Sequence, residues 1–404
     1  MNDIFFRIPT DMEPLMPKHG KAELIELACE IFRLSGRLSG ILHPITRRSI
    51  ANLVRAMNSY YSNLIEGHRT NPYDIEKALK QDYSKNPEQK ELQEESVAHI
   101  NVQKALEKYL RSESEINIFS SEWICRLHEE FYRNLPESYR HLTDDKGNPY
   151  EVIPGEFRET EVTVGRHIPP HHETLPAFLE RFSSYYSEEV QGAPNQVLAI
   201  AASHHRLAWI HPFMDGNGRV VRLFSHSLFI QTETDAGGLW AISRGLARVG
   251  SQYPTLLANA DRLRKNDYDG RGRMSDEGLY EFCKFFLQVA IDQISFMSSL
   301  LELDALERRI ERYLQFSSAF GKHGESANYL LREALQRGEF PRGEAGRITN
   351  RSERTARNIL KSLTESRLLV SDTEKGPVRL GFPVNVLEYY FPLLYSEADL
   401  RQKS

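Results

Sequence analysis

The chain has 404 residues, 40% of them hydrophobic, and a net charge of −5 at pH 7. This length predicts two or three domains with a sizeable core, and the mild negative charge argues against a globally basic binder of nucleic acid or anionic membrane. The three cysteines lack metal-binding spacing, and no apolar run approaches the roughly 18 residues of a membrane span. We therefore expect a cytoplasmic protein with reduced thiols.

The first 115 residues form a predicted N-terminal helical region. Apolar spacing predicts helices over residues 22–38, 44–66 and 97–110, a short helix near 73–81 and a charged linker after it. Beside its core face, the second helix carries a polar stripe of Arg55, Ser59, Ser62 and Glu66. An acidic side chain at a helix C-terminus opposes the helix dipole by about 0.3–1 kcal/mol, so another interaction should favour Glu66 there.

A further helix over residues 120–135 precedes a predicted strand pair. The two strands, 155–158 and 162–165, are separated by a short turn and contribute Glu156, Phe157, Arg158, Val162, Thr163 and Val164. Three histidines follow around two prolines without the carboxylate spacing typical of a metal centre, so surface positions are predicted for His167, His171 and His172.

Most of the recognisable chemistry lies in the segment HPFMDGNGR at residues 211–219, with Arg222 one turn further on. A helix is predicted to end just before His211, because Pro212 disfavours the α region for the residue before it. A second apolar-faced helix begins after the glycines, which places them at a helix N-terminus. Unpaired backbone N–H groups and a partial positive charge make such a position suitable for a phosphate.

The side chains around this loop suit a nucleotide. Arg219 and Arg222 lie on one helix face and can both bind phosphate oxygens, while Asp215 can hold Mg²⁺ between phosphates. An imidazole with an ordinary pKa near 6.5 suits a general base, which typically raises a reaction rate roughly 10²–10⁴-fold. We assign this role to His211. Phe213 has no chemistry of its own and is expected to pin the loop to the core. The alternative to a nucleotide site is a chance Asp-Gly-Asn-Gly turn between two core helices.

The segment HPFMDGNGRVVR resembles the signature HPFx(D/E)GNGRxxR of the Fic family (Fic/Doc superfamily) and fills every position of it. The resemblance implies a protein adenylyltransferase, in which His211 deprotonates a Ser, Thr or Tyr hydroxyl that attacks the α-phosphate of ATP. It also implies that Asp215 ligates Mg²⁺ and that the remaining positions bind phosphates: Gly216, Asn217 and Gly218 as an anion hole, Arg219 and Arg222 at the β- and γ-phosphates. The Gly-Asn-Gly sequence favours nucleotidyl transfer over the kinase-like Doc branch.

Two further segments resemble parts of the same family. Residues 62–67, SNLIEG, resemble its inhibitory motif (S/T)xxxE(G/N), which implies that Glu66 pairs with Arg222 and occupies space needed by the γ-phosphate. The alternative is a solvated helix end. The predicted hairpin at 155–165 resembles the Fic flap, to whose edge the backbone of a target adds as a strand, the alternative being an ordinary surface hairpin. The expected fold is mainly α, a Fic-type helical bundle with a small β-hairpin flap.

Beyond a linker at 317–324, three short helices and a hairpin are predicted, over 329–336, 343–348, 352–363, 368–370 and 378–380. They resemble a winged helix-turn-helix, which gives domains 1–115, 116–316 (Fic catalytic domain) and 325–404. The third helix carries a basic set suitable for DNA phosphates: Arg351, Arg354, Arg357 and Lys361. Acidic residues interrupt it, so DNA binding and protein contact both stay open.

The preferred function is AMP transfer from ATP to a target protein, or to the protein itself, held back by Glu66. One alternative is removal of AMP or use of another nucleotide donor, because the loop binds phosphates and not the base. Another is a nucleotide-sensing DNA-binding regulator, against which an intact His211 argues. The target, the modified residue, the relieving signal and the oligomeric state, a homodimer included, cannot be read from the sequence.

Overall fold

The computed structural model describes residues 6–112, 116–143, 147–165, 167–317 and 320–396, and this part of the chain is mainly helical, as predicted. The N-terminal region contributes α1 (Lys21–Ser39), α2 (Pro44–Ile65), α3 (Pro72–Ala78) and α4 (Pro87–Ser112). The middle of the chain contributes α5 (Ser121–Arg133), α6 (Leu175–Ser184), α7 (Ala193–Ile210), α8 (Asn217–Gln231), α9 (Ile242–Arg248), α10 (Gln252–Ala260), α11 (Asp276–Leu301) and α12 (Leu303–Phe316). Among these described helices, none is both long and apolar enough to span a bilayer.

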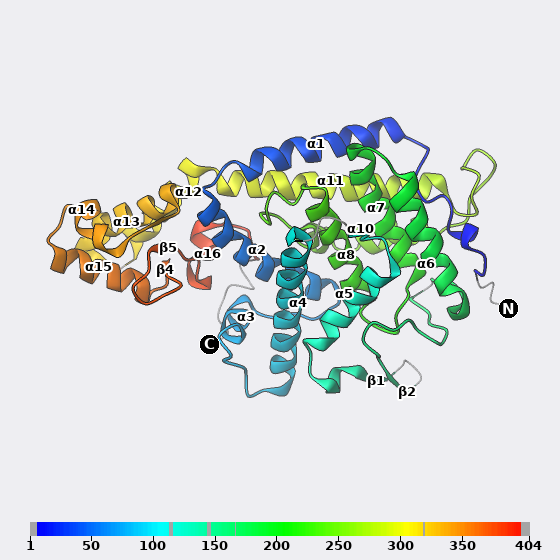
Figure 1. The fold of residues 1–404 in the computed structure, drawn as a ribbon, viewed down its shortest axis with the longest axis horizontal. Helices are drawn as coiled ribbons and strands as arrows, with labels where there is room; N and C mark the ends of the chain where they lie inside the picture. The colour runs from blue at the N-terminus through cyan, green and yellow to red at the C-terminus, as the bar shows by residue number, and fades with distance from the viewer. Residues whose placement is uncertain (1–5, 113–115, 144–146, 166, 318–319, 397–404) are drawn as a thin grey trace.

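The helices form a bundle around α7 and α8. Along one side, α1 runs beside α11 (Figure 1), and the apolar face of α1 is fully buried at Leu24, Ala28 and Ile31. Below them α7 and α8 pack against each other, and α4 and α5 cover α8. Helix α2 lies against α4 and α9, and its last turn reaches the side chains of α8. The end of α2 is therefore held next to the start of α8.

Local sequence fixes both ends of α2. Pro44 occupies the first turn, where its missing N–H has no helical partner to lose, and the side chain of His43 accepts a hydrogen bond from the amide of Ile45. At the other end Glu66 is the C-cap, and Gly67 has a φ of 86°, a conformation that favours glycine. The helix thus ends where the sequence predicted, with Glu66 at its tip.

The C-terminal region contains the predicted helices and hairpin, with one additional strand, β3, and one additional helix, α16. Its elements are α13 (Gly324–Arg337), β3 (Glu339–Phe340), α14 (Ala345–Thr349), α15 (Glu353–Glu365), β4 (Leu369–Val370), β5 (Val378–Leu380) and α16 (Val384–Tyr390). The sheet has the antiparallel order β3-β5-β4, with Leu369 opposite Leu380 and Phe340 opposite Val378. This region extends from one end of the bundle (Figure 1). Whether it acts as a winged helix-turn-helix, and whether residue 325 begins a separate domain, stays a prediction.

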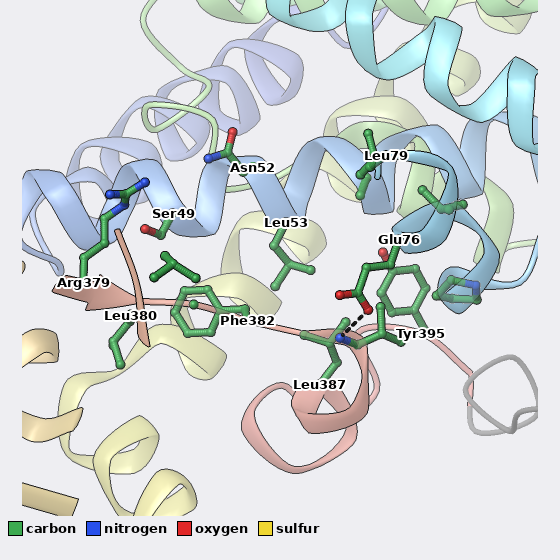
Figure 2. Close-up of a pocket in the computed structure, with 16 residues that line it drawn as sticks. Ser49, Asn52, Leu53, Glu76, Leu79, Arg379, Leu380, Phe382, Leu387 and Tyr395 are labelled. Carbon is green, nitrogen blue, oxygen red and sulfur yellow. Dashed lines mark hydrogen bonds between the residues drawn. The ribbon is translucent and has the colours of Figure 1, made fainter. Parts of the chain in front are cut away.

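The chain returns from this region to α2. Tyr61 donates a hydrogen bond to the carbonyl of Leu394 over 3.0 Å, and the Tyr395 ring stacks on Tyr61 and meets Tyr60 edge-on. Between α2, α3 and the C-terminal sheet lies a pocket of about 260 Å³, lined by apolar side chains such as Leu53 (Figure 2). The C-terminal region is thereby packed directly on the helix that ends at Glu66.

The predicted strand pair at 155–158 and 162–165 is wrong. The two-stranded sheet of the described residues lies earlier, between β1 (His141–Thr143) and β2 (Pro149–Glu151), and residues 155–165 contribute a single bridge from Val164 to His167. The physical reason is Arg158, whose side chain is buried and whose amide donates to the carbonyl of Pro212. A residue anchored inward in this way is not available for a strand with a free face.

The charged linker predicted after residue 81 is largely helix. Helix α4 begins at Pro87, ten residues before the predicted start at residue 97. Apolar periodicity did not predict this part of the helix because its buried side chains are polar, including those of Gln93, Glu95 and Ser96. The side chains of Glu95 and Ser96 bond to neighbours of the 211–219 turn or of α2.

Candidate active site

The segment HPFMDGNGR forms a tight turn between α7 and α8. His211 closes α7 in a left-handed conformation with φ of 48°, and Gly216 precedes α8 with φ of 76°. The side chain of Asn217 closes the turn, accepting from the amide of Phe213 and donating to its carbonyl over 3.0 and 2.8 Å. The ring of Phe213 is fully buried and stacks on His128 at 4.0 Å, so the turn is fixed to the core as predicted.

A cavity of about 830 Å³ opens beside this turn. Its lining includes Glu66, His211, Asn217, Gly218 and Arg222. Other lining residues are apolar or aromatic, such as Ile65, Val221, Tyr253 and Leu257, or charged, such as Asp261 and Arg262. The volume lies within the range of roughly 300–1,000 Å³ typical of small-molecule sites. A ligand that carries both anionic groups and an apolar portion fits this lining.

Ser62 and Glu66, at the end of α2, meet α8 beside the cavity. Arg222 Nη2 lies 2.6 Å from Glu66 Oε1, and its Nε donates to Ser62 Oγ over 2.9 Å. A Cβ placed on Gly218 would lie only 2.2 Å from Glu66 Oε1, so the carboxylate sits directly on the first turn of α8. Burial alone would raise the pKa of Glu66, but the charge and hydrogen bond of Arg222 outweigh it and hold that pKa below its ordinary value.

His211 faces the cavity in its neutral form. Burial lowers the pKa of its imidazole to about 4, and the positive charges of His167 and Arg158 act in the same direction. The ordinary value near 6.5 assumed from the sequence is therefore too high for the protein without ligand. At neutral pH the ring carries a lone pair that can accept a proton. A bound polyphosphate would raise this pKa, because an anion stabilises the imidazolium form.

Asp215 is oriented by a residue that the sequence did not single out. Tyr132 on α5 donates its hydroxyl proton to Asp215 Oδ2 over 2.6 Å, and His128 Nε2 lies 3.3 Å from the Asp215 carbonyl. The Tyr132 ring also explains Gly216, since a Cβ there would lie 3.0 Å from the ring. Burial and the neighbouring carboxylate raise the pKa of Tyr132, so it stays a donor. A partly exposed, oriented carboxylate next to a helix N-terminus fits Mg²⁺, which takes one or two carboxylates and completes its shell with phosphate and water.

Arg219 is held by a second carboxylate. Its Nη1 lies 3.3 Å from Glu95 Oε1 on α4, and its guanidinium lies 4.9 Å above the ring of Phe131. The other oxygen of Glu95 lies 2.6 Å from His68 Nδ1, and its hydrogen bond raises the pKa of that histidine. Both predicted arginines therefore meet acidic side chains, Arg222 at Glu66 and Arg219 at Glu95. Sequence reasoning missed Glu95 because it lies in the part of α4 taken for a linker.

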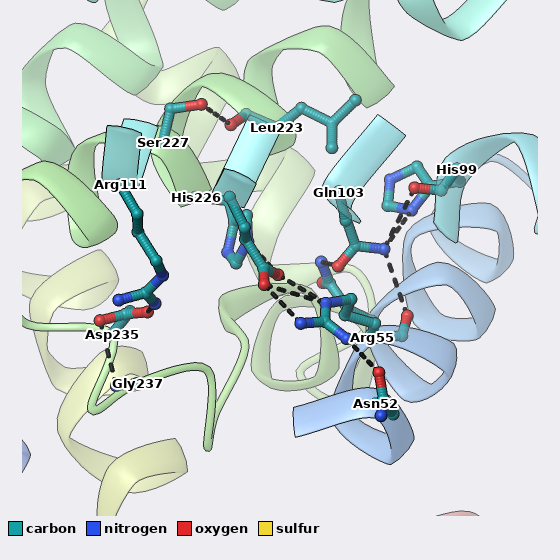
Figure 3. A network of polar contacts seen from close by, with 12 residues as sticks. Asn52, Arg55, His99, Gln103, Arg111, Leu223, His226, Ser227, Asp235 and Gly237 are labelled. Atoms are coloured by element: carbon teal, nitrogen blue, oxygen red, sulfur yellow. Dashed lines mark hydrogen bonds and ion pairs between the residues drawn. The ribbon is translucent and has the colours of Figure 1, made fainter. Parts of the chain in front are cut away.

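A second buried polar network joins the middle of α2 to α4 and α8 (Figure 3). Arg55 on α2 binds Glu107 on α4 at 2.6 Å, and His226 on α8 lies 3.5 Å from the same carboxylate. Burial alone would raise the pKa of Glu107, but His226 and Arg55 lower it to about 2. Ser59 on α2 also donates to the Ser96 carbonyl on α4. The polar stripe predicted on α2 therefore connects this helix to α4 and, through Glu107, to α8.

The predicted docking segment divides into an anchored and an exposed part. Arg158 donates from Nε to the carbonyl of His211 over 2.9 Å, and its other nitrogens reach the carbonyls of Thr160 and Pro170. A side chain so placed holds the 211–219 turn in position, and a part for Arg158 in target docking stays a prediction. Glu156, Thr163 and Val164 are exposed, Phe157 and Val162 half-buried.

The surface assignment of His167 is also corrected. This residue lines the cavity, and its Nε2 lies 2.7 Å from the carbonyl of Trp209. Of the predicted flap residues, Val164 lines the same cavity.

The helical bundle thus carries a glycine-rich turn at the start of α8, with His211 and Arg222 beside one cavity. Residues 118–229 match the family model described as Fic/DOC family. The match covers less than a third of the chain and includes the 211–219 turn and the helices on either side of it.

Curated relatives named Protein adenylyltransferase Fic match a short part of the chain. The one from Drosophila grimshawi is 40% identical over 77 residues, 19% of this chain and 16% of that relative. The one from Culex quinquefasciatus is 42% identical over 99 residues, 24% and 19% of the two chains. The matches span less than a fifth of the length of these relatives.

Solved structures extend the likeness in fold. A Fic family protein from Desulfovibrio desulfuricans G20 superposes with a TM-score of 0.51 at 17% identity, over 93% of this chain and 98% of that one. Fic-1 from C. elegans gives a TM-score of 0.51 at 16% identity, over 70% and 74%. At these identities the likeness concerns the fold alone.

Proposed function

We propose that the chain is a protein adenylyltransferase that transfers AMP from ATP to a Ser, Thr or Tyr hydroxyl of a target protein. The observation that carries the proposal is the convergence of His211, Gly218 and Arg222 on one cavity. This places a neutral imidazole beside an anion-binding helix N-terminus and a guanidinium. The name of the curated relatives supports the same class of reaction.

The proposed reaction is an in-line substitution at the α-phosphorus of ATP. The target hydroxyl gives its proton to the unprotonated nitrogen of His211 while its oxygen forms a bond to phosphorus. The bond from phosphorus to the bridging oxygen breaks, and pyrophosphate leaves with that electron pair, which yields an AMP–protein phosphodiester. Backbone N–H groups at the start of α8 and the guanidinium of Arg222 stabilise the phosphate charge. The side chain of Asp215 would hold Mg²⁺, which supplies further neutralisation of the polyphosphate when bound.

We further propose that Glu66 inhibits this reaction. Its carboxylate lies on the turn where a phosphate would bind and occupies one guanidinium nitrogen of Arg222. A phosphate at the same place meets both the bulk and the negative charge of the side chain. ATP then binds with its terminal phosphates displaced, and the α-phosphorus is not aligned with the target oxygen. Movement of α2, which carries Glu66, would relieve the block.

The test is covalent labelling by Glu66→Gly protein incubated with a cell lysate and Mg²⁺. ATP, GTP, CTP and UTP, each labelled at the α-phosphate, are compared side by side. The proposal expects incorporation from ATP and its loss in the Glu66→Gly/His211→Ala double variant. A donor other than ATP would change the assigned substrate, and incorporation unaffected by His211→Ala would contradict the proposed base.

A further inference from the structure

A second cluster of ligand-type side chains lies at the base of the 159–165 segment, outside the cavity. His171 Nε2 lies 3.3 Å from Glu161 Oε1, and His172 Nδ1 lies 2.7 Å from the same oxygen. The three ligand atoms all lie within 4.8 Å of one another. Surface positions are predicted for these histidines because no carboxylate lies at metal-binding spacing near them in sequence. The fold brings Glu161, ten residues before His171, next to both rings.

We propose that Glu161, His171 and His172 form a binding site for a divalent transition-metal ion of the zinc class. Two imidazoles and one carboxylate are a recurrent protein ligand set for Zn²⁺, with a fourth position left to water. Nitrogen ligands favour such an ion over Mg²⁺ or Ca²⁺, which prefer oxygen. The proposal does not depend on adenylyl transfer.

The separations are compatible with one ion after a small adjustment. Metal–ligand bonds of about 2.0–2.2 Å place tetrahedral ligands roughly 3.3–3.6 Å apart. The distance from His171 to Glu161 already equals 3.3 Å. The 2.7 Å hydrogen bond from His172 to Glu161 would have to open by about 0.6–0.9 Å on the same tetrahedral geometry, a change within reach of an exposed glutamate side chain.

The backbone under these ligands is held by buried Arg158. Its guanidinium donates to the carbonyls of Thr160 and Pro170, which directly precede Glu161 and His171. The amide of His171 donates to the Phe6 carbonyl over 3.0 Å. Both sides of the cluster are therefore fixed before an ion arrives, which lowers the entropy lost on binding.

The surroundings also supply a partner for one ligand. Glu173 Oε2 lies 3.7 Å from His171 Nδ1, on the side of the ring away from Glu161. Histidine ligands are commonly oriented by a carboxylate at their second nitrogen. An ion here would fix the 159–165 segment, whose Val164 lines the cavity, and Arg158 would connect the site to the carbonyl of His211.

The test uses the full chain, freed of metal with a chelator and then titrated with Zn²⁺ by calorimetry and with Co²⁺ by visible absorption. We expect one saturable site, with Co²⁺ absorption of four-coordinate character. His172→Ala and Glu161→Gln should each weaken binding at least tenfold. His141→Ala, which removes an exposed histidine on β1, is the matched control and should bind as wild type does.

Hydrogen exchange reports where the ion acts. Zn²⁺ should slow amide exchange over residues 159–173 in the wild type and not in His172→Ala, while circular dichroism verifies that each variant is folded. The proposal is overturned if wild type and His172→Ala bind Zn²⁺ equally, or if binding is lost in Asp215→Ala but retained in Glu161→Gln. In either case the cluster would be a pair of histidine–carboxylate hydrogen bonds only.

Discussion

Substitution of Glu66 should raise AMP transfer by an amount that the geometry bounds. A phosphate at the start of α8 would lie about 4 Å from this carboxylate, a repulsion of about 1 kcal/mol in water and about 4 kcal/mol at an effective dielectric constant of 20. Because the Glu66 side chain is 31% exposed, the repulsion falls between these limits. Each 1.4 kcal/mol is a factor of ten, so we expect Glu66→Gly to transfer AMP roughly 10–100-fold faster.

Glu66→Gln separates the charge of the side chain from its bulk. Its amide has nearly the same shape, so it would still crowd Gly218, where Glu66 Oε1 lies 2.2 Å from a constructed Cβ. We expect a rate between those of wild type and Glu66→Gly. The assay is the initial rate of AMP incorporation at fixed ATP, Mg²⁺ and lysate concentrations, with exposed Glu88→Gln as control. Equal rates for wild type, Glu66→Gly and Glu88→Gln would refute the inhibitory role.

Three further outcomes follow from the site and its supports. The pKa of Glu107 is lowered from 4.5 to about 2, so the Glu107→Gln protein should have about 3 kcal/mol less unfolding free energy than wild type at pH 7. A depressed carboxyl pKa stabilises the fold above the unfolded pKa, so this difference should shrink as pH falls from 4.5 toward 2 in denaturant titrations; a constant difference would contradict it. Tyr132→Phe should raise the Mg²⁺ concentration for half-maximal transfer about tenfold, since Asp215 loses its orienting hydrogen bond, and an unchanged Mg²⁺ dependence would speak against that role. If the C-terminal region binds duplex DNA, the full chain should give a salt-sensitive mobility shift that weakens in the Arg354→Glu/Arg357→Glu variant, since both arginines are exposed on α15. The absence of a shift at low salt would favour a protein-contact role for this region instead.

The conformation of the 211–219 turn could be predicted because the signals that determine it are local. Pro212 ends one helix, the glycines begin the next, and the spacing of Arg219 and Arg222 places both on one face. Helix boundaries around the loop, the buried Phe213 and the position of Glu66 at the tip of α2 all follow from neighbours within a few residues. The close approach of Glu66 to Arg222 needed the family resemblance, because the two lie 156 residues apart.

The parts that failed depend on long-range polar contacts. Glu95 lies on α4 in a stretch with little apolar periodicity, and its burial becomes intelligible only with Arg219 and His68 as partners. Arg158 resembled a strand residue, yet its guanidinium donates to the backbone carbonyls of Thr160, Pro170 and His211, the last of them 53 residues away in sequence. Tyr132 had no motif at all. Such residues satisfy buried polar groups, and a sequence pattern built on apolar spacing does not register them.

The most direct measurement compares two labels on the same protein. Glu66→Gly protein is incubated with target-containing lysate and ATP labelled either at the α- or at the γ-phosphate, with the Glu66→Gly/His211→Ala variant beside it. If the turn grips the triphosphate so that the histidine faces the α-phosphorus, protein becomes labelled from the α-position alone, and only while His211 is present. Label arriving from the γ-position, or α-label that persists without His211, would contradict the account.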